Sequence, residues 1–183
     1  MSIMSPIAPA PIRRLTVAQG DSIASGDPDV IFTTVLGSCV AVCLHDGRAG
    51  IGGMNHFLLA EPAPIANEEV RLLNRYGVHS MELLINAMLK RGAMRRNLKA
   101  RIYGGATMRQ GLGEIGTTNI QFARRFLINE SIAILGENVG GTSARRIEFR
   151  PAAGLSRCKT VSSQPVEHII KISPPSGGDV ELF

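Results

Sequence analysis

The stretch that decides the fold of this chain is residues 30–59, which read VIFTTVLGSCVAVCLHDGRAGIGGMNHFLL. Residues 30–36 are apolar and β-branched, which favours a strand, and Gly37-Ser38 then permits a sharp backbone turn. Residues 40–44 predict a second strand, and Asp46-Gly47 is a hairpin signal before a returning strand at 51–59. The stretch therefore predicts a strand, a turn and a β-hairpin.

Two helices are predicted further along the chain. The first ends at Gly92 and has one apolar face at helical spacing, formed by Met81, Leu84, Ile85, Met88 and Leu89. The second is capped by Thr117 or Thr118 and turns Phe122, Phe126 and Leu127 inward. Short strands are predicted at 100–103, 132–135, 145–150, 155–161 and 166–172. The fold class expected is α+β, with mostly antiparallel strands and two main helices.

The 183 residues, 44% of them apolar, predict one folded domain. We place it at 15–172, between a flexible Pro-rich N-terminal extension at 1–14 and a flexible C-terminal tail at 173–183. Three cysteines cannot all pair, and no secretory signal is evident, so a reducing, cytoplasmic location is expected. No uncharged apolar run approaches the roughly 18 residues of a membrane span, so no membrane insertion is expected.

The net charge of +5 is concentrated in residues 90–101, which hold six basic side chains and no acidic one. Proteins that stack nucleic-acid bases place aromatic side chains among such charges, whereas only Tyr76 and Tyr103 lie near this segment. We therefore expect no nucleic-acid partner. The segment is interpreted as a solvated helix end and loop, with an acidic protein surface as the other candidate partner.

Cys39 and His56 are the candidate catalytic pair, because a cysteine needs a neighbouring base to become a thiolate near neutral pH. A two-residue turn at Asp46-Gly47 makes them diagonal neighbours on one face of the hairpin, and a four-residue turn at 46–49 places them directly opposite. A three-residue turn would separate them. Thr33 or Thr34 on the preceding strand offers a hydroxyl or carbonyl to orient the imidazole.

Gly37 and Ser38 form the candidate substrate and oxyanion region, since small residues admit a substrate carbonyl and leave backbone N–H groups free. Two alternatives remain open at this point. Cys39 can be a packing residue, as buried cysteines usually are, or Cys39 and Cys43 can form a metal pair with His45 or His56. The metal site is disfavoured because the other candidate ligands, Cys158, His79 and His168, are scattered along the chain. Cys158 and His168 are interpreted as structural.

Five motifs in series resemble the CheD family of chemoreceptor glutamine deamidases, over roughly residues 15–172. They are TTVLGSCVAVC at 33–43, GGMNH at 52–56, YGGA at 103–106, IGTTN at 115–119 and GGTSARR at 140–146. The paired glycines at 104–105 are interpreted as a turn, and those at 140–141 as a turn or a loop lining the site. Arg145 and Arg146 could meet acidic residues of a receptor but are not expected to be catalytic.

The resemblance implies a cysteine-dependent protein-glutamine glutaminase that converts glutamines on cytoplasmic chemoreceptor helices to glutamate and releases ammonia, through a thioester and without cofactor or metal. It implies Cys39 as nucleophile, His56 as base and Thr33 as third catalytic residue. It further implies the phosphatase CheC as a partner in some bacteria. The fold implied is a layered β-sandwich with flanking helices, similar to the catalytic domain of the cytotoxic necrotizing factor toxins. A non-catalytic adaptor with this fold is the rival hypothesis.

Overall fold

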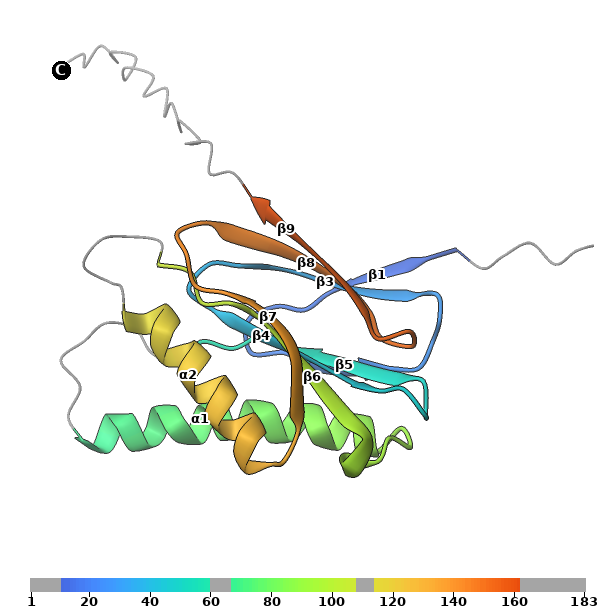
Figure 1. Cartoon of the computed structure of the whole chain (residues 1–183), viewed down its shortest axis with the longest axis horizontal. Helices are drawn as coiled ribbons and strands as arrows, with labels where there is room; N and C mark the ends of the chain where they lie inside the picture. Colours follow the sequence, from blue (N-terminus) through green and yellow to red (C-terminus); the bar gives the residue numbers. More distant parts are fainter. Residues whose placement is uncertain (1–10, 60–66, 108–113, 162–183) are drawn as a thin grey trace, which may run out of the picture.

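The computed structural model describes residues 11–59, 67–107 and 114–161, with the backbone alone for 67–75 and 114. These residues form an α+β fold (Figure 1). Its elements, besides a 3-10 turn at Arg95–Asn97, are β1 (Arg13–Thr16), β2 (Ser22–Ser25), β3 (Val30–Leu36), β4 (Val40–Asp46), β5 (Ile51–Asn55), α1 (Asn67–Leu89), β6 (Leu98–Gly104), α2 (Glu114–Asn129), β7 (Ala133–Val139), β8 (Ala144–Arg150) and β9 (Leu155–Val161).

The strands form two sheets, with orders β1-β3-β8-β9 and β2-β5-β4-β6-β7. Most neighbours are antiparallel, as expected, but β1 runs parallel to β3 and β6 runs parallel to β7, so both sheets are mixed. The four-stranded sheet lies over one face of the five-stranded sheet, and both helices lie against the other face (Figure 1). The result is a β-sandwich with helices on one side.

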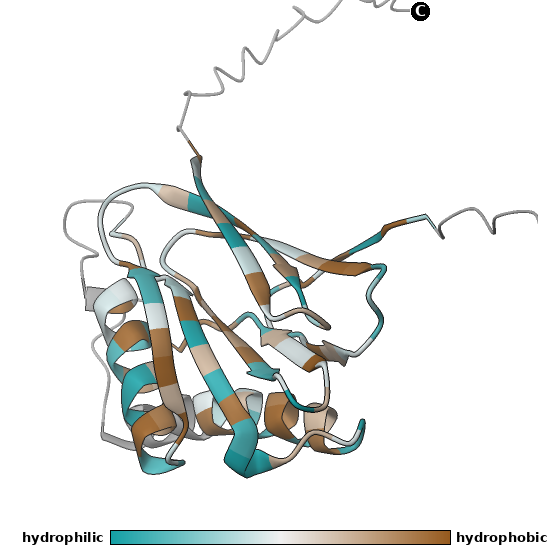
Figure 2. Cartoon of the chain, turned by 45° about the vertical axis from the view of Figure 1, so that its right-hand side comes forward, coloured by the Kyte–Doolittle hydropathy of each residue, from teal (hydrophilic) through white to brown (hydrophobic). Residues whose placement is uncertain are grey.

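Strand β4 lies at the centre of this arrangement and is buried on both faces. Val40, Val42 and Leu44 belong to the core shared with the helices, whereas Ala41 and Cys43 belong to the core between the sheets. Such alternation is the two-residue period of a strand, and apolar and polar bands alternate along the strands in Figure 2. A residue's parity in β4 therefore decides which core it enters.

The hairpin closes with a four-residue loop, one residue later than the four-residue turn at 46–49 that the sequence offers. Asp46 pairs with Ile51, which leaves the four residues 47–50 in the loop. The Asp46 carboxylate accepts the N–H groups of Arg48 and Ala49 inside the loop, and that of Met94 beyond it. Because these bonds hold a buried Asp46 inside the strand, it cannot serve as the turn residue that Asp-Gly predicts.

The helix predictions are confirmed in their apolar faces and corrected at one end. Helix α1 ends at Leu89, and Gly92 follows with φ of +100° as its terminator. Helix α2 includes Glu114, so Thr117 and Thr118 lie inside it rather than at its cap. Strands β1 and β2 were not predicted. The strand expected at 166–172, His168, the tail at 173–183 and most of the extension at 1–14 lie outside the described residues.

Candidate active site

Cys39 is the last residue of the three-residue connection between β3 and β4. One residue later, Val40 exchanges both backbone hydrogen bonds with Phe57, at 2.9 and 3.0 Å. Cys39 and His56 directly precede these two bridge partners, so they lie on the same face, as diagonal neighbours whose backbones are about 7 to 8 Å apart. The expected juxtaposition of Cys39 and His56 is therefore present. The strand register differs, however, from the two registers that the sequence suggested.

His56 is buried between the sheets, with one ring nitrogen held and the other left without a partner. Its Nδ1 lies 3.0 Å from Thr34 Oγ1 and 3.2 Å from the Val17 carbonyl oxygen. Its Nε2 is buried and has no hydrogen-bond partner among the described residues. A buried imidazole nitrogen in this condition is available to a reacting group.

The tautomer of His56 follows from these contacts. The Thr34 hydroxyl donates to the Val17 carbonyl at 2.8 Å, so its proton is not available to Nδ1. Because the Val17 carbonyl can only accept, Nδ1 must itself carry the proton and donate it. In the neutral imidazole the lone pair is then on Nε2, which is the state a general base requires.

The structure brings Thr34, rather than Thr33, to the imidazole. Thr34 is buried on the inner face of β3, whereas Thr33 is half-exposed and its side chain belongs to the opposite face. Thr33 contributes only through its backbone: its carbonyl accepts the Val17 N–H at 2.8 Å, and Val17 in turn contacts His56. The resemblance-based role of Thr33 is therefore not supported by the position of its side chain.

The environment favours the neutral state of both Cys39 and His56. Burial raises the pKa of the Cys39 thiol, and the thiol's contact with its own backbone N–H offsets this only in part. Burial also lowers the pKa of His56, against the opposing effects of the Val17 carbonyl and the charge of Asp21. The free protein is therefore expected to hold a thiol and a neutral imidazole rather than a thiolate–imidazolium pair.

The loop at 37–39 is held by two segments of the chain, helix α2 and residues 105–106. The Asn119 amide, fully buried on α2, donates to the Ser38 carbonyl at 2.9 Å and accepts the Leu59 N–H at 2.8 Å. The Gly105 and Ala106 N–H groups donate to the carbonyls of Cys39 and Gly37. Among the described residues, no acceptor takes the N–H of Gly37 or Ser38, which leaves both for a substrate, as expected of an oxyanion region.

The first glycine pair, at the end of β6, lies beside the loop 37–39, and the second pair, in the β7–β8 loop, lies behind the first. Gly104 and Gly105 have φ of +101° and +68°, and a Cβ on Gly104 would collide with the Cys39 carbonyl. Gly140 donates its N–H to the Gly104 carbonyl at 2.9 Å. The first pair is thus a turn, as predicted, and it also packs closely against Cys39. The second pair holds the first in place through the hydrogen bond from Gly140.

Asn119 is the residue that sequence reasoning missed. It appeared only as part of a motif, yet a signal was available: Asn119, Phe122, Ala123 and Phe126 follow the spacing of one helical face. A polar side chain in an apolar stripe needs a buried partner, and here the partners are the loops on either side of the site.

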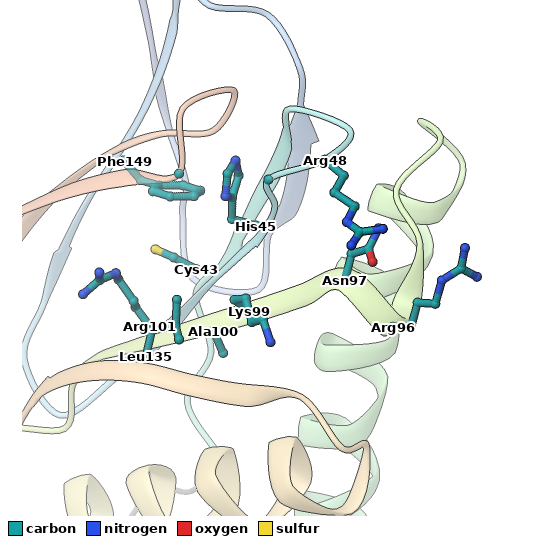
Figure 3. A pocket seen from close by; sticks show the side chains of 12 residues that line it. Cys43, His45, Arg48, Arg96, Asn97, Lys99, Ala100, Arg101, Leu135 and Phe149 are labelled. Atoms are coloured by element: carbon teal, nitrogen blue, oxygen red, sulfur yellow. The ribbon is translucent and has the colours of Figure 1, made fainter.

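Among the described residues, Cys43, His45 and Cys158 are not brought to the site. Cys43 is buried in the core between the sheets, and burial raises its pKa strongly. Together with His45 it lines a pocket of about 440 Å³ near the Asp46 end of β4 (Figure 3), whereas Cys39 precedes the Val40 end. Cys158 is half-buried in β9. Within the described residues no group of three or more His, Cys, Asp or Glu side chains is placed to hold a metal.

The fold and this site together define a two-sheet α+β protein with a buried histidine directly after β5 and a cysteine directly before β4. A family model described as "CheD chemotactic sensory transduction" matches residues 58–160. A Zymomonas mobilis protein named "Probable chemoreceptor glutamine deamidase CheD" is 55% identical over 172 residues, which cover 93% of each chain. A protein of the same name from Caulobacter vibrioides NA1000 is 44% identical and again covers 93% of each. The chain belongs to the CheD family.

Among solved structures, the chain is similar to a Neisseria meningitidis protein of the DUF152 family, with a TM-score of 0.42 and 13% identity over 67% of this chain and 54% of that one. In the described part of the chain, no helix is both long enough and apolar enough to cross a membrane.

Proposed function

We propose that the chain is a protein-glutamine deamidase that converts glutamines of methyl-accepting chemoreceptors to glutamates in bacterial chemotaxis. Membership of the CheD family and the names of the relatives support the activity and the substrate class. The observation that carries the chemistry is the buried His56 Nε2, an acceptor without a described partner on the face of the hairpin that also holds Cys39.

The first half of the reaction is an acyl transfer. His56 Nε2 takes the proton of the Cys39 thiol as the sulfur attacks the carboxamide carbon of the substrate glutamine, forming a tetrahedral intermediate. The N–H groups of Gly37 and Ser38 stabilise its oxyanion. The C–N bond then breaks, the protonated His56 gives its proton to the leaving nitrogen, ammonia departs, and a thioester remains on Cys39.

The second half is hydrolysis of that thioester. The same imidazole removes a proton from water, the hydroxide adds to the thioester carbon, and the C–S bond breaks. The thiolate recovers its proton from His56, and a glutamate side chain is released. Thr34 and Val17 hold the imidazole in one tautomer through both halves, and no step calls for a metal or an organic cofactor.

The test is deamidation of a receptor fragment co-expressed with the protein. We expect peptide mapping by mass spectrometry to find glutamine converted to glutamate with the wild-type protein, and no conversion with Cys39→Ala. Cys158→Ser is the matched control, because Cys158 is half-buried in β9, away from the proposed nucleophile, and it should retain activity. Conversion by a folded Cys39→Ala protein would contradict the covalent mechanism.

The finer expectations belong to the same proposal: a cytoplasmic location, CheC as a partner where it exists, and a sandwich similar to the catalytic domain of the cytotoxic necrotizing factor toxins. A non-catalytic adaptor is the rival. An adaptor would need neither a buried base without a partner nor a glycine-walled cysteine loop, and both are features of this site.

A further inference from the structure

The thiol of Cys39 is not directed at His56 but at a glutamine of the same chain. Its Sγ lies 3.5 Å from Gln19 Oε1, and this is a hydrogen bond in which the thiol donates to a carboxamide oxygen. The chemical group that holds the proposed nucleophile is therefore the same group that the proposed substrate presents to it.

The turn that carries Gln19 is fastened to the site. The Gly20 N–H donates to the His56 carbonyl at 2.7 Å, and the His56 N–H donates to the Asp21 carbonyl at 3.1 Å. The Asp21 carboxylate in turn accepts the Ala18 N–H at 3.0 Å. The backbone at Gln19 is thus fixed relative to His56, whereas the Gln19 side chain is exposed and can swing away at little cost.

We infer that Gln19 is a substrate mimic: its carboxamide occupies the place of the substrate glutamine's carboxamide at Cys39 and must be displaced before the thiol can react. This inference rests on the proposed function. Two independent features support it, namely the thiol donating to Gln19 and the His56 Nε2 without a described partner. Displacement of Gln19 frees the thiol to turn toward Nε2, which completes the pair that the chemistry uses.

Gln19 is held without being a substrate itself. A thiol that donates its proton to the carboxamide oxygen directs S–H at oxygen, whereas deamidation needs the sulfur lone pair on the carboxamide carbon. Gln19 is therefore expected to remain a glutamine in the purified wild-type protein.

The test compares Gln19→Ala with wild type in the full-length chain. The first measurement is the alkylation rate of Cys39 by iodoacetamide at neutral pH, resolved by peptide mapping with Cys158 as the internal reference. Loss of the acceptor should raise the Cys39 rate by about fivefold, the factor that one ordinary hydrogen bond is worth, and leave the Cys158 rate unchanged. Asn129→Ala, at the exposed end of α2, is the control and should alkylate like wild type.

The second measurement is steady-state deamidation of a receptor fragment. Removing a competing mimic should lower KM with kcat nearly unchanged. An unchanged alkylation rate, or a raised KM, would overturn the inference, and so would conversion of Gln19 to glutamate in wild type but not in Cys39→Ala. Failure of the proposed function would look different, because a folded Cys39→Ala protein would still deamidate the fragment whatever Gln19→Ala does.

Discussion

Thr34 lies on β3 of one sheet and His56 directly follows β5 of the other, and a 3.0 Å contact between Oγ1 and Nδ1 joins them across the core of the sandwich. With the Thr34 proton given to Val17, this contact fixes the imidazole tautomer and leaves Nε2 as the base. The packing of one sheet on the other therefore sets the protonation pattern of the site.

Thr34→Val should lower kcat by about tenfold, a part of the ~10²- to 10⁴-fold that general-base catalysis contributes. The loss is partial because the Val17 carbonyl remains to accept the Nδ1 proton. Thr33→Val is the matched control, since Thr33 presents only its backbone to this network, and it should keep nearly full activity. Receptor-fragment deamidation by both variants is the measurement, and a larger loss in Thr33→Val would restore the role that the family resemblance implies.

Asn119→Asp should lower kcat because a carboxylate still accepts the Leu59 N–H but cannot donate to the Ser38 carbonyl. Once protonated, the introduced carboxyl group can donate again, so the activity of the variant relative to wild type should rise as the pH falls. The measurement is this ratio between about pH 5 and 8, with Asn129→Asp as the exposed control on the same helix. A ratio that does not change with pH would show that Asn119 acts on stability alone.

Gly104→Ala and Gly140→Ala separate backbone strain from contact with the nucleophile. Both glycines have positive φ, at +101° and +73°, so both substitutions cost about 1 to 2 kcal/mol of folding stability. Only at Gly104 does the added Cβ collide with the Cys39 carbonyl, whereas at Gly140 it meets nothing within 4 Å. We expect a large fall in kcat for Gly104→Ala alone, measured beside thermal unfolding; equal losses in both variants would contradict this assignment.

The pH profile of kcat/KM should show a wide plateau. Burial lowers the pKa of His56, so the base stays neutral, and activity persists, below the ordinary histidine pKa of about 6.5. Burial raises the pKa of Cys39, so the thiol keeps its proton beyond the ordinary value of about 8.5. Activity should therefore fall only below the ordinary histidine pKa of about 6.5, where His56 gains a proton. An acid limb at or above about pH 6.5 would contradict the lowered pKa of His56. A loss of activity on the alkaline side, where an imidazolium gives up its proton, would instead indicate a thiolate–imidazolium pair.

The β3–β4–β5 core of the fold was predictable, because apolar strands and glycine-rich turns are local properties of residues 30–59. The parallel pairs β1–β3 and β6–β7 were not, since they depend on contacts between distant segments. Strand β1 is short, exposed and carries Arg13 and Arg14, so it has no apolar pattern to detect.

The site was predictable to the same extent. The pairing of Cys39 with His56 follows from the alternation of side chains along the strands. It survives the change in hairpin register because the expected turn at 46–49 and the observed loop at 47–50 place the two residues on the same face. Thr34 could have been chosen over Thr33 from the inward alternation of Phe32, Thr34 and Leu36. Gln19 could not have been found, because its contact depends on how the β1–β2 turn is fastened to His56.

The central claim is that Cys39 forms a thioester with the substrate glutamine, and capture of that intermediate tests it most directly. Wild-type protein and a receptor fragment would be mixed, quenched in acid within the first turnover, and mapped by mass spectrometry. The account predicts that the peptide containing Cys39 carries the fragment, less one ammonia, and that the adduct is absent from Cys39→Ala and strongly reduced in His56→Ala. The account would be contradicted if the fragment were deamidated in the first turnover with no adduct on Cys39 at any quench time, and if Cys39→Ala deamidated it equally fast.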